Sequence, residues 1–240
     1  MPWRSFSKMN KPRLIVTRDG SHSLFHPLRG EACHSRHGAL QESLHVFIEH
    51  GLKYKLRQKE TVSVLEIGFG AGLNAWLTAE EAISKKRLIH YVAAEAFPID
   101  EELYAQLNYP ALRSFDKERK IFSAIHACPW DEEVTIDPFF IIHKKLGKAE
   151  EMVFSSACDL IYLDAFSPET QPELWSTEFL RSLCQSLKPT GVLVTYCCKG
   201  VVKRIFTDLG LKVSKLPGPP GKREMLRAER VAGKEETTVK

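Results

Sequence analysis

The sequence has 240 residues, of which 43% are hydrophobic and 27% are charged, and its formal net charge is +4. A chain of this length and composition can bury one substantial core, which excludes collagen-like, disordered and low-complexity proteins. Its apolar runs are far shorter than the roughly 20 residues that cross a bilayer, and its basic first residues lack the apolar stretch of a secretory signal. We therefore expect a cytoplasmic protein that spans no membrane.

The six cysteines are scattered along the chain and form no Cys-x-x-Cys pair. This usage predicts reduced thiols rather than a disulfide framework. Cys33, His34 and His37 invite a metal site, but such a site needs at least one more ligand, and no second cluster follows at zinc-finger spacing. We interpret the three as ordinary loop side chains and predict no metal.

The charges are distributed unevenly along the chain. Residues 1–36 hold seven Lys or Arg against two Asp or Glu, and residues 199–230 hold nine against three. Residues 100–180 hold sixteen acidic side chains and seven basic ones. A charged run is usually a solvated face, but two basic ends favour an anionic partner if both converge on one catalytic mouth.

Strand and helix patterns alternate along the chain. The sequence predicts an amphipathic helix at 38–51 and two further helices at 73–83 and 178–187. It predicts strands at 62–67, 88–94, 159–163 and 191–197, and an antiparallel hairpin at 211–228. Alternating strands and helices predict a doubly wound, mostly parallel α/β sheet.

The chain shows no internal repeat, and its only Pro/Gly-rich stretch, at 217–221, lies too near the end to separate two domains. The simplest interpretation is one domain with an N-terminal extension. We expect residues 1–50 to form that extension and to pack on the core, residues 51–230 to form the α/β domain, and residues 231–240 to form a disordered tail.

A glycine-rich turn follows the first predicted strand, where doubly wound sheets bind their ligands. Its pattern is Gly-x-Gly-x-Gly, whereas dinucleotide sites favour Gly-x-Gly-x-x-Gly. Glu66 precedes the glycines; it would repel a pyrophosphate, but it would attract the ammonium group of S-adenosylmethionine. We therefore predict a site for this cofactor formed by the residues of the turn: Glu66, Gly68, Phe69, Gly70, Gly72 and Asn74.

Glu95 ends the second predicted strand, twenty-three residues beyond Gly72. Folds of this kind place an acid at that point on the ribose hydroxyls. An NAD site would share the feature, and a plain surface carboxylate is the structural alternative. The turn rather than the acid therefore favours S-adenosylmethionine, and Glu95 joins the predicted cofactor site.

The third predicted strand ends in a second acidic segment, which delivers Asp164 and Phe166 to the same edge of the sheet. Asp164 could instead cap the following helix, but Phe166 is suited to stacking on a planar base. We predict both as catalytic residues. Pro168, Pro172 and Trp175 stiffen and cover the loop beyond, so Trp175 is predicted to form part of a substrate lip.

Five motifs occur in one order between His34 and Ala228: GALQESLHVF at 38–47, GFGAGLN at 68–74, EAFP at 95–98, DAFSPETQPELW at 164–175 and GPPGKREML at 218–226. The glycine turn is common to many methyltransferases, whereas the proline-and-tryptophan segment and the KREM ending are much more specific. The set resembles the MnmC-type tRNA wobble-uridine methyltransferases.

This resemblance implies a class I, Rossmann-like methyltransferase fold with S-adenosylmethionine as methyl donor. It implies methylation of the primary amine of 5-aminomethyl(-2-thio)uridine at the tRNA wobble position, giving 5-methylaminomethyl(-2-thio)uridine. The glycine turn and Glu95 then bind the cofactor, Asp164 and Phe166 face the base and the amine, and Glu42 helps to close the site.

The basic hairpin is expected to meet the tRNA. Lys222 and Arg223 follow the Pro/Gly turn, beside the catalytic edge of such a fold, and we predict that they hold anticodon-stem phosphates. Many relatives carry a second, FAD-dependent domain, so we expect this chain to resemble the stand-alone methyltransferase. It departs from the family at 139–143, where the Gly-Asp near the adenine has no counterpart.

Two other functions remain open. An aminopropyltransferase of the polyamine-synthase kind would share the fold and the acidic mouth, but it would not need the basic ends or the KREM ending. A non-catalytic RNA-binding module would need neither the glycine turn nor Asp164. For Asp164 itself we favour positioning of the amine over general-base catalysis, because a carboxylate also stabilises the ammonium.

Overall fold

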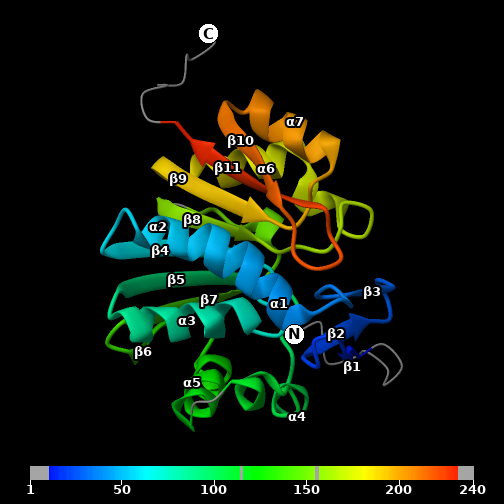
Figure 1. Cartoon of the computed structure of the whole chain (residues 1–240), viewed down its shortest axis with the longest axis vertical. Helices are drawn as coiled ribbons and strands as arrows, with labels where there is room; N and C mark the ends of the chain where they lie inside the picture. Colours follow the sequence, from blue (N-terminus) through cyan, green and yellow to red (C-terminus); the bar gives the residue numbers. More distant parts are fainter. Residues whose placement is uncertain (1–10, 114–115, 155–156, 232–240) are drawn as a thin grey trace.

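The computed structural model describes residues 11–113, 116–154 and 157–231, and an eight-stranded sheet forms the centre of this part of the chain (Figure 1). Its strands run in the order β10-β11-β9-β8-β4-β5-β7-β6. The five central strands pair in parallel, and β6, β10 and β11 pair antiparallel at the two sides. The strands are β4 (Thr61–Ile67), β5 (Leu88–Glu95), β6 (Glu133–Asp137), β7 (Phe140–Leu146), β8 (Cys158–Leu163), β9 (Leu187–Thr195), β10 (Leu211–Pro217) and β11 (Glu224–Arg230). The predicted doubly wound sheet and its closing hairpin are confirmed.

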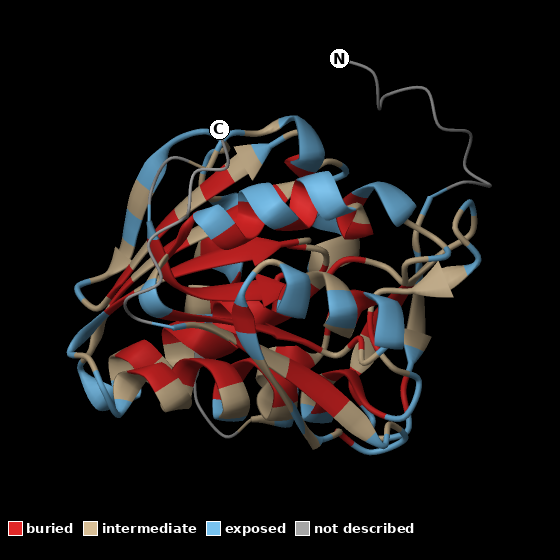
Figure 2. Cartoon of the chain, turned by 90° about the horizontal axis from the view of Figure 1, so that it is seen from above, coloured by how far each residue is buried: buried red, intermediate tan, exposed pale blue. Residues whose placement is uncertain are grey.

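Helices cover both faces of this sheet, and their inward sides are buried together with the strands (Figure 2). One face carries a continuous helix composed of α1 (Ala39–Ser43), the π-helical η3 (Leu44–Lys53) and α2 (Tyr54–Leu56), together with α3 (Leu73–Lys85) and α5 (Asp116–Ala127). The other face carries α6 (Thr177–Gln185) and α7 (Gly200–Asp208). The connections contain short helices: α4 (Glu101–Tyr104), η4 (Tyr109–Leu112), η5 (Ala149–Glu151) and η6 (Pro172–Trp175). With both faces covered, the carboxyl ends of the strands are left to bind a ligand.

A small antiparallel sheet precedes the first helix and was not predicted from the sequence. It consists of β1 (Arg13–Val16), β2 (His22–His26) and β3 (Glu31–Ala32), and it lies beside the start of α1 (Figure 1). The helix that follows runs from Ala39 to Leu56, beyond the predicted end at residue 51. The division into an extension and a domain stays a prediction. Of the predicted tail at 231–240, residues 232–240 lie outside the described residues.

A local sequence signal sets where α6 begins. The hydroxyl oxygen of Ser176 accepts a hydrogen bond from the backbone N–H of Phe179, which caps the start of α6. Phe179, Leu180 and Leu183 then lie on one side of α6 and are buried against the sheet. Within the described residues, every helix is too short or too polar to traverse a lipid bilayer.

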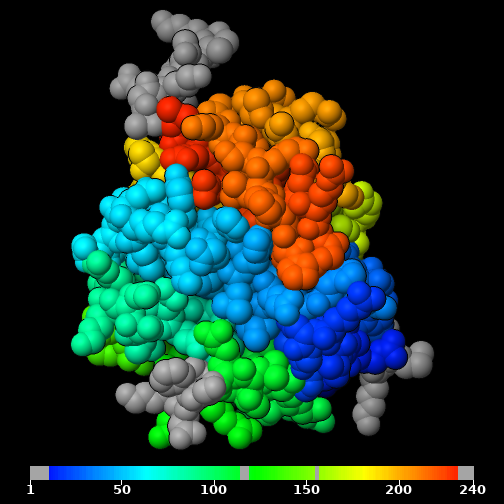
Figure 3. Space-filling view, viewed as in Figure 1, coloured from blue at the N-terminus to red at the C-terminus, as the bar shows by residue number. Residues whose placement is uncertain are grey.

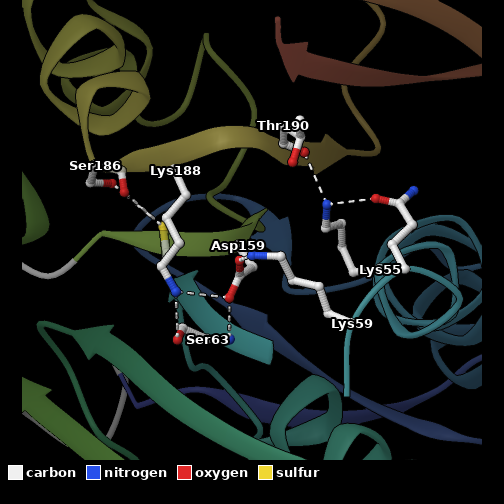
Figure 4. A network of polar contacts seen from close by, with 9 residues as sticks. Lys55, Lys59, Ser63, Asp159, Ser186, Lys188 and Thr190 are labelled. Carbon is white, nitrogen blue, oxygen red and sulfur yellow. Dashed lines mark hydrogen bonds and ion pairs between the residues drawn. The ribbon is translucent and has the colours of Figure 1, made fainter. Parts of the chain in front are cut away.

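A polar network joins the amino-terminal ends of β4, β8 and β9, at the opposite edge from the carboxyl ends (Figure 4). Asp159, whose side chain is 2% exposed, accepts hydrogen bonds from Lys59, from the Nζ of Lys188 at 3.0 Å and from the N–H of Ser63 at 3.0 Å. Burial alone would raise the pKa of Asp159, but these hydrogen bonds outweigh it and hold the pKa below its usual value. The carboxylate therefore stabilises the fold while it is ionised.

Asp159→Asn should lower the free energy of unfolding by about 2 kcal/mol at neutral pH, because two amines lose their charged partner. The folded-state pKa is depressed, so this contribution is present above the unfolded pKa of about 4 and disappears as the pH falls below it. Denaturant titrations at neutral pH and at a pH below about 4 check the prediction. Glu49→Gln, which removes an exposed partner of Lys53 and Arg57, is the control; a loss as large as that of Asp159→Asn would contradict it.

Candidate functional site

A cavity of about 340 Å³ lies at the carboxyl ends of β4, β5 and β8. The turn after β4, the end of β5 and the loop after β8 form three of its walls. Residues 147–150, which follow β7, and the N-terminal sheet complete it. Of the residues predicted from the sequence, the cavity brings together Gly68, Phe69, Gly70, Glu95, Asp164 and Phe166.

The three glycines of the turn have different surroundings. A Cβ atom on Gly68 would lie 2.7 Å from the carbonyl oxygen of Asp164, and one on Gly72 would lie 2.7 Å from the Nε2 of His126. These two glycines are therefore required by packing within the protein. A Cβ atom on Gly70 would meet no other atom nearer than 3.9 Å. Gly70 is thus the position where the bare backbone borders free space in the cavity.

Glu95 is held in the cavity wall by two backbone groups. Its Oε2 accepts the N–H of Gly70 at 2.9 Å, and its Oε1 accepts the N–H of Phe97 at 2.8 Å. Each carboxylate oxygen retains a further lone pair, so the fixed side chain can still accept hydrogen bonds from a ligand. This geometry suits a pair of ribose hydroxyls.

Asn74 joins two carboxylates below the cavity. Its Nδ2 donates to the Oε1 of Glu66 at 3.0 Å and to the Oδ2 of Asp164 at 2.8 Å. Glu66 is fully buried and does not line the cavity, and both burial and the charge of Asp164 raise its pKa well above the usual value.

Asp164 itself lines the cavity. Burial and, after it, the charge of Glu42 raise the pKa of Asp164 to about 8, although Asn74 and Lys222 oppose the shift. A carboxyl group that changes protonation near neutral pH is suited to proton transfer.

Phe166, from the loop after β8, forms part of the cavity wall. The guanidinium carbon of Arg29 lies 5.2 Å from the centre of its ring, and the imidazole of His26 meets the ring edge-on at 5.4 Å. Trp175 donates its indole N–H to the carbonyl oxygen of Phe166 at 2.8 Å, but it is only 5% exposed and does not line the cavity. Trp175 therefore holds the loop that carries Phe166.

The C-terminal hairpin is fastened to the same loop by Lys222. Its ammonium pairs with the buried carboxylate of Glu42 and lies 3.7 Å from the ring centre of Tyr196, whose hydroxyl donates to the carbonyl oxygen of Ala165 at 2.8 Å. Glu42, Lys222 and Arg223 do not line the cavity. Arg223, the residue after Lys222, is exposed on the surface. Figure 3 shows the hairpin, in orange and red, against the blue N-terminal segment.

Residues from the N-terminal sheet are the part of the site that sequence reasoning missed. His26, Arg29, Cys33 and His34 line the cavity. From the sequence, Cys33 and His34 were considered only as metal ligands and set aside, and the only signal for His26 and Arg29 was the basic charge of this segment. Burial lowers the pKa of His34 to about 4 and raises that of the Cys33 thiol, so both are neutral near physiological pH. Among the described residues, no group of three or more His, Cys, Asp or Glu side chains could hold a metal ion.

Comparison with known proteins gives one family and a consistent set of relatives. Residues 122–231 match the family described as S-adenosyl-L-methionine-dependent methyltransferase. The tRNA 5-methylaminomethyl-2-thiouridine biosynthesis bifunctional protein MnmC of Delftia acidovorans is 31% identical over 217 residues, which are 85% of this chain and 33% of that protein. The protein of the same name from Chromohalobacter salexigens is 30% identical and covers 83% of this chain and 30% of its own length. The chain thus spans about a third of the length of these relatives.

A solved structure supports the fold assignment. The crystal structure of MnmC2 from Aquifex aeolicus superposes with a TM-score of 0.76 at 24% identity, covering 92% of this chain and 70% of that one. At this identity the likeness is one of fold.

Gly70→Val should abolish binding of S-adenosylmethionine while leaving a folded protein, because the branched side chain would project into the cavity. Calorimetric titration measures the affinity, and circular dichroism checks the fold. Gly210→Val is the matched control, because Gly210 also has a positive φ, of 82°, and open space around its Cβ position, but lies outside the cavity. Wild-type affinity in folded Gly70→Val would remove the turn from the cofactor site.

Proposed function

This chain belongs to the MnmC-type S-adenosyl-L-methionine-dependent methyltransferases, and on that premise we propose that it methylates tRNA at the wobble position. The substrate is the primary amine of 5-aminomethyl(-2-thio)uridine, and the product is 5-methylaminomethyl(-2-thio)uridine. The observation that carries the proposal is that the glycine turn, Glu95, Asp164 and Phe166 line one and the same cavity.

The residues present fit the cofactor. Gly70 provides the cradle that a Cβ atom would fill, Glu95 offers acceptors for the ribose, and residues 147–150 border the part of the cavity beyond Glu95. When bound, S-adenosylmethionine supplies a methyl group on a positively charged sulfur. Phe69 shapes the wall, and Asn74 holds Glu66 and Asp164 beneath the turn.

The protein must then bind the amine and remove a proton from it. A primary amine with a pKa of about 10 is neutral in only about one molecule per thousand near pH 7. Asp164, with a pKa of about 8, accepts a proton from such an ammonium more readily than an ordinary carboxylate does. We propose that Phe166 stacks on the uracil ring while Asp164 orients the amine and takes its proton. The nitrogen lone pair would then be free to accept the methyl group, with the sulfur of the bound cofactor as the leaving group.

Asp164→Asn should lower the methylation rate roughly 100-fold while changing cofactor affinity only a few fold. Because Asp164 loses its proton near pH 8, kcat/KM of the wild type should rise with pH and level off above that value. In the variant the rise should instead continue toward the pKa of the amine, about 10.

Nucleoside mass analysis of tRNA carrying 5-aminomethyluridine, before and after incubation with protein and cofactor, measures the reaction. No mass gain with the wild type would refute the proposed function. Transfer of an aminopropyl group from decarboxylated S-adenosylmethionine would replace it with the polyamine-synthase alternative. Unchanged single-turnover rates in Asp164→Asn would leave Asp164 a purely structural acid.

The tRNA backbone is proposed to meet the exposed side of the hairpin. Lys203, Lys215 and Arg223, from α7, β10 and the hairpin turn, surround the single carboxylate of Glu224; Lys215 bonds to it at 2.7 Å, and the other two add attraction that lowers its pKa further. We propose the phosphate contact for Arg223 with Lys203. Because Glu42 binds its ammonium, we assign Lys222 to holding the turn that presents Arg223.

The double variant Lys203→Glu, Arg223→Glu should bind tRNA much more weakly, with a shallower dependence of log affinity on log salt, by about 0.9 for each phosphate that the protein no longer neutralises. Titrations at several salt concentrations measure both quantities. Lys85→Glu with Lys86→Glu, two exposed lysines at the end of α3 on the opposite edge of the sheet, make the same charge change. An equal effect of the two double variants would assign the loss to net charge alone.

A further inference from the structure

A second hollow, of about 950 Å³, opens beside the catalytic cavity. It lies between the turn of the N-terminal sheet after β2, the segment from Phe97 to α4, and the tip of the loop after β8. His26, Arg29 and Phe97 line both spaces. A molecule that reaches Asp164 from this side therefore extends into the hollow.

The hollow carries exposed apolar side chains. Leu28 is 61% exposed and Phe97 is 43% exposed, and both belong to its lining. Large apolar groups that stay in water at the mouth of a site indicate a surface that is covered when a partner binds. Leu28 lines the hollow but not the catalytic cavity.

A cation is available at the border between the two spaces. One guanidinium N–H of Arg29 donates to the carbonyl oxygen of Thr170 at 3.2 Å, and within the part of the chain that the structure describes Arg29 forms no ion pair. The acidic side chains of the hollow are Asp100, Glu102 and Glu169; the first is paired with Lys11 and the last with Lys199. Two of these three carboxylates are therefore neutralised by a lysine, which lowers the repulsion of an anionic group that approaches Arg29.

We propose that this hollow binds the nucleotide adjacent to the wobble uridine, with its base against Leu28 and Phe97 and its phosphate at Arg29. The inference rests on the proposed function, because it takes the uridine at Asp164 as its starting point. A nucleotide joined covalently to that uridine has to lie in the neighbouring space. Single-stranded RNA is commonly held by this combination of apolar surfaces for unstacked bases and a cation for the backbone.

The test is a cycle between one protein variant and one missing base. Anticodon stem-loops carrying 5-aminomethyluridine are prepared intact, or abasic at the position on one side or the other of that uridine. Leu28→Ala should bind the intact loop about tenfold more weakly than the wild type does, the scale of losing one stacked base. On one of the two abasic loops the two proteins should bind equally, because the partner of Leu28 is already absent.

Val153→Ala is the matched control, because Val153 is also an exposed aliphatic residue, 82% exposed, and it lines neither space. It should not change affinity for any of the loops. Leu28→Trp, which enlarges the apolar surface, should tighten binding of the intact loop only. Cofactor affinity should stay at the wild-type value in all three variants.

An equal loss on the intact and both abasic loops would overturn the proposal, as would a dimer that dissociates in Leu28→Ala, since the hollow would then receive a second copy of the chain. Affinities are measured without methyl transfer. If Leu28→Ala loses affinity only for loops that keep the adjacent base, but the wild type never methylates the loop, the proposed function alone is refuted. If the wild type methylates the loop and Leu28→Ala shows no such base-dependent loss, only this inference is refuted.

Discussion

Two carboxylates share one amide at the centre of the site. Glu66 lies in β4 and Asp164 directly follows the neighbouring strand β8, and Asn74 donates to both. Burial and the negative charge of Asp164 raise the pKa of Glu66 well above its usual value, so the two groups do not both ionise freely. A positive charge in the cavity relieves that repulsion. Both proposed ligands, a sulfonium and an amine, bring such a charge, so the two buried acids favour the molecules that the site is proposed to bind.

Backbone packing fixes this arrangement. The β4 turn passes so close to the residue after β8 that only glycine fits at position 68, and α3 then begins at Leu73 with Asn74 in its first turn. On the other side, Trp175 and Tyr196 hold the carbonyl groups of Phe166 and Ala165. The side chain of Asp164 is thus held between two rigid segments, which suits a residue that must both orient an amine and accept its proton.

The parts of the fold that were predicted well from the sequence are those with a strong local pattern, such as a run of apolar, β-branched residues. The buried runs at β4 and β8 begin within one residue of their predicted starts. In contrast, β9 begins four residues earlier than predicted, because 188–190 reads as a turn and Thr190 adopts a positive φ of 64°. The neighbouring strands β6 and β7 were missed, as was the N-terminal sheet, since such strands are defined by their partners as much as by their own pattern.

The sequence identifies residue types that suit the site, but it does not show which of them reach the cavity, because burial is a property of the folded chain. The sequence marks Glu66, Trp175 and Lys222 as chemically suited to a ligand, yet their side chains are committed to Asn74, to Phe166 and to Glu42. The N-terminal segment shows the converse. Glu31 accepts a hydrogen bond from the hydroxyl of Ser167 at 2.9 Å, which fastens the small sheet over the loop that carries Phe166. Since burial is the largest cause of the raised pKa of Asp164, this cover is part of the chemistry: a segment without a catalytic motif helps to set the pH at which the proposed base works.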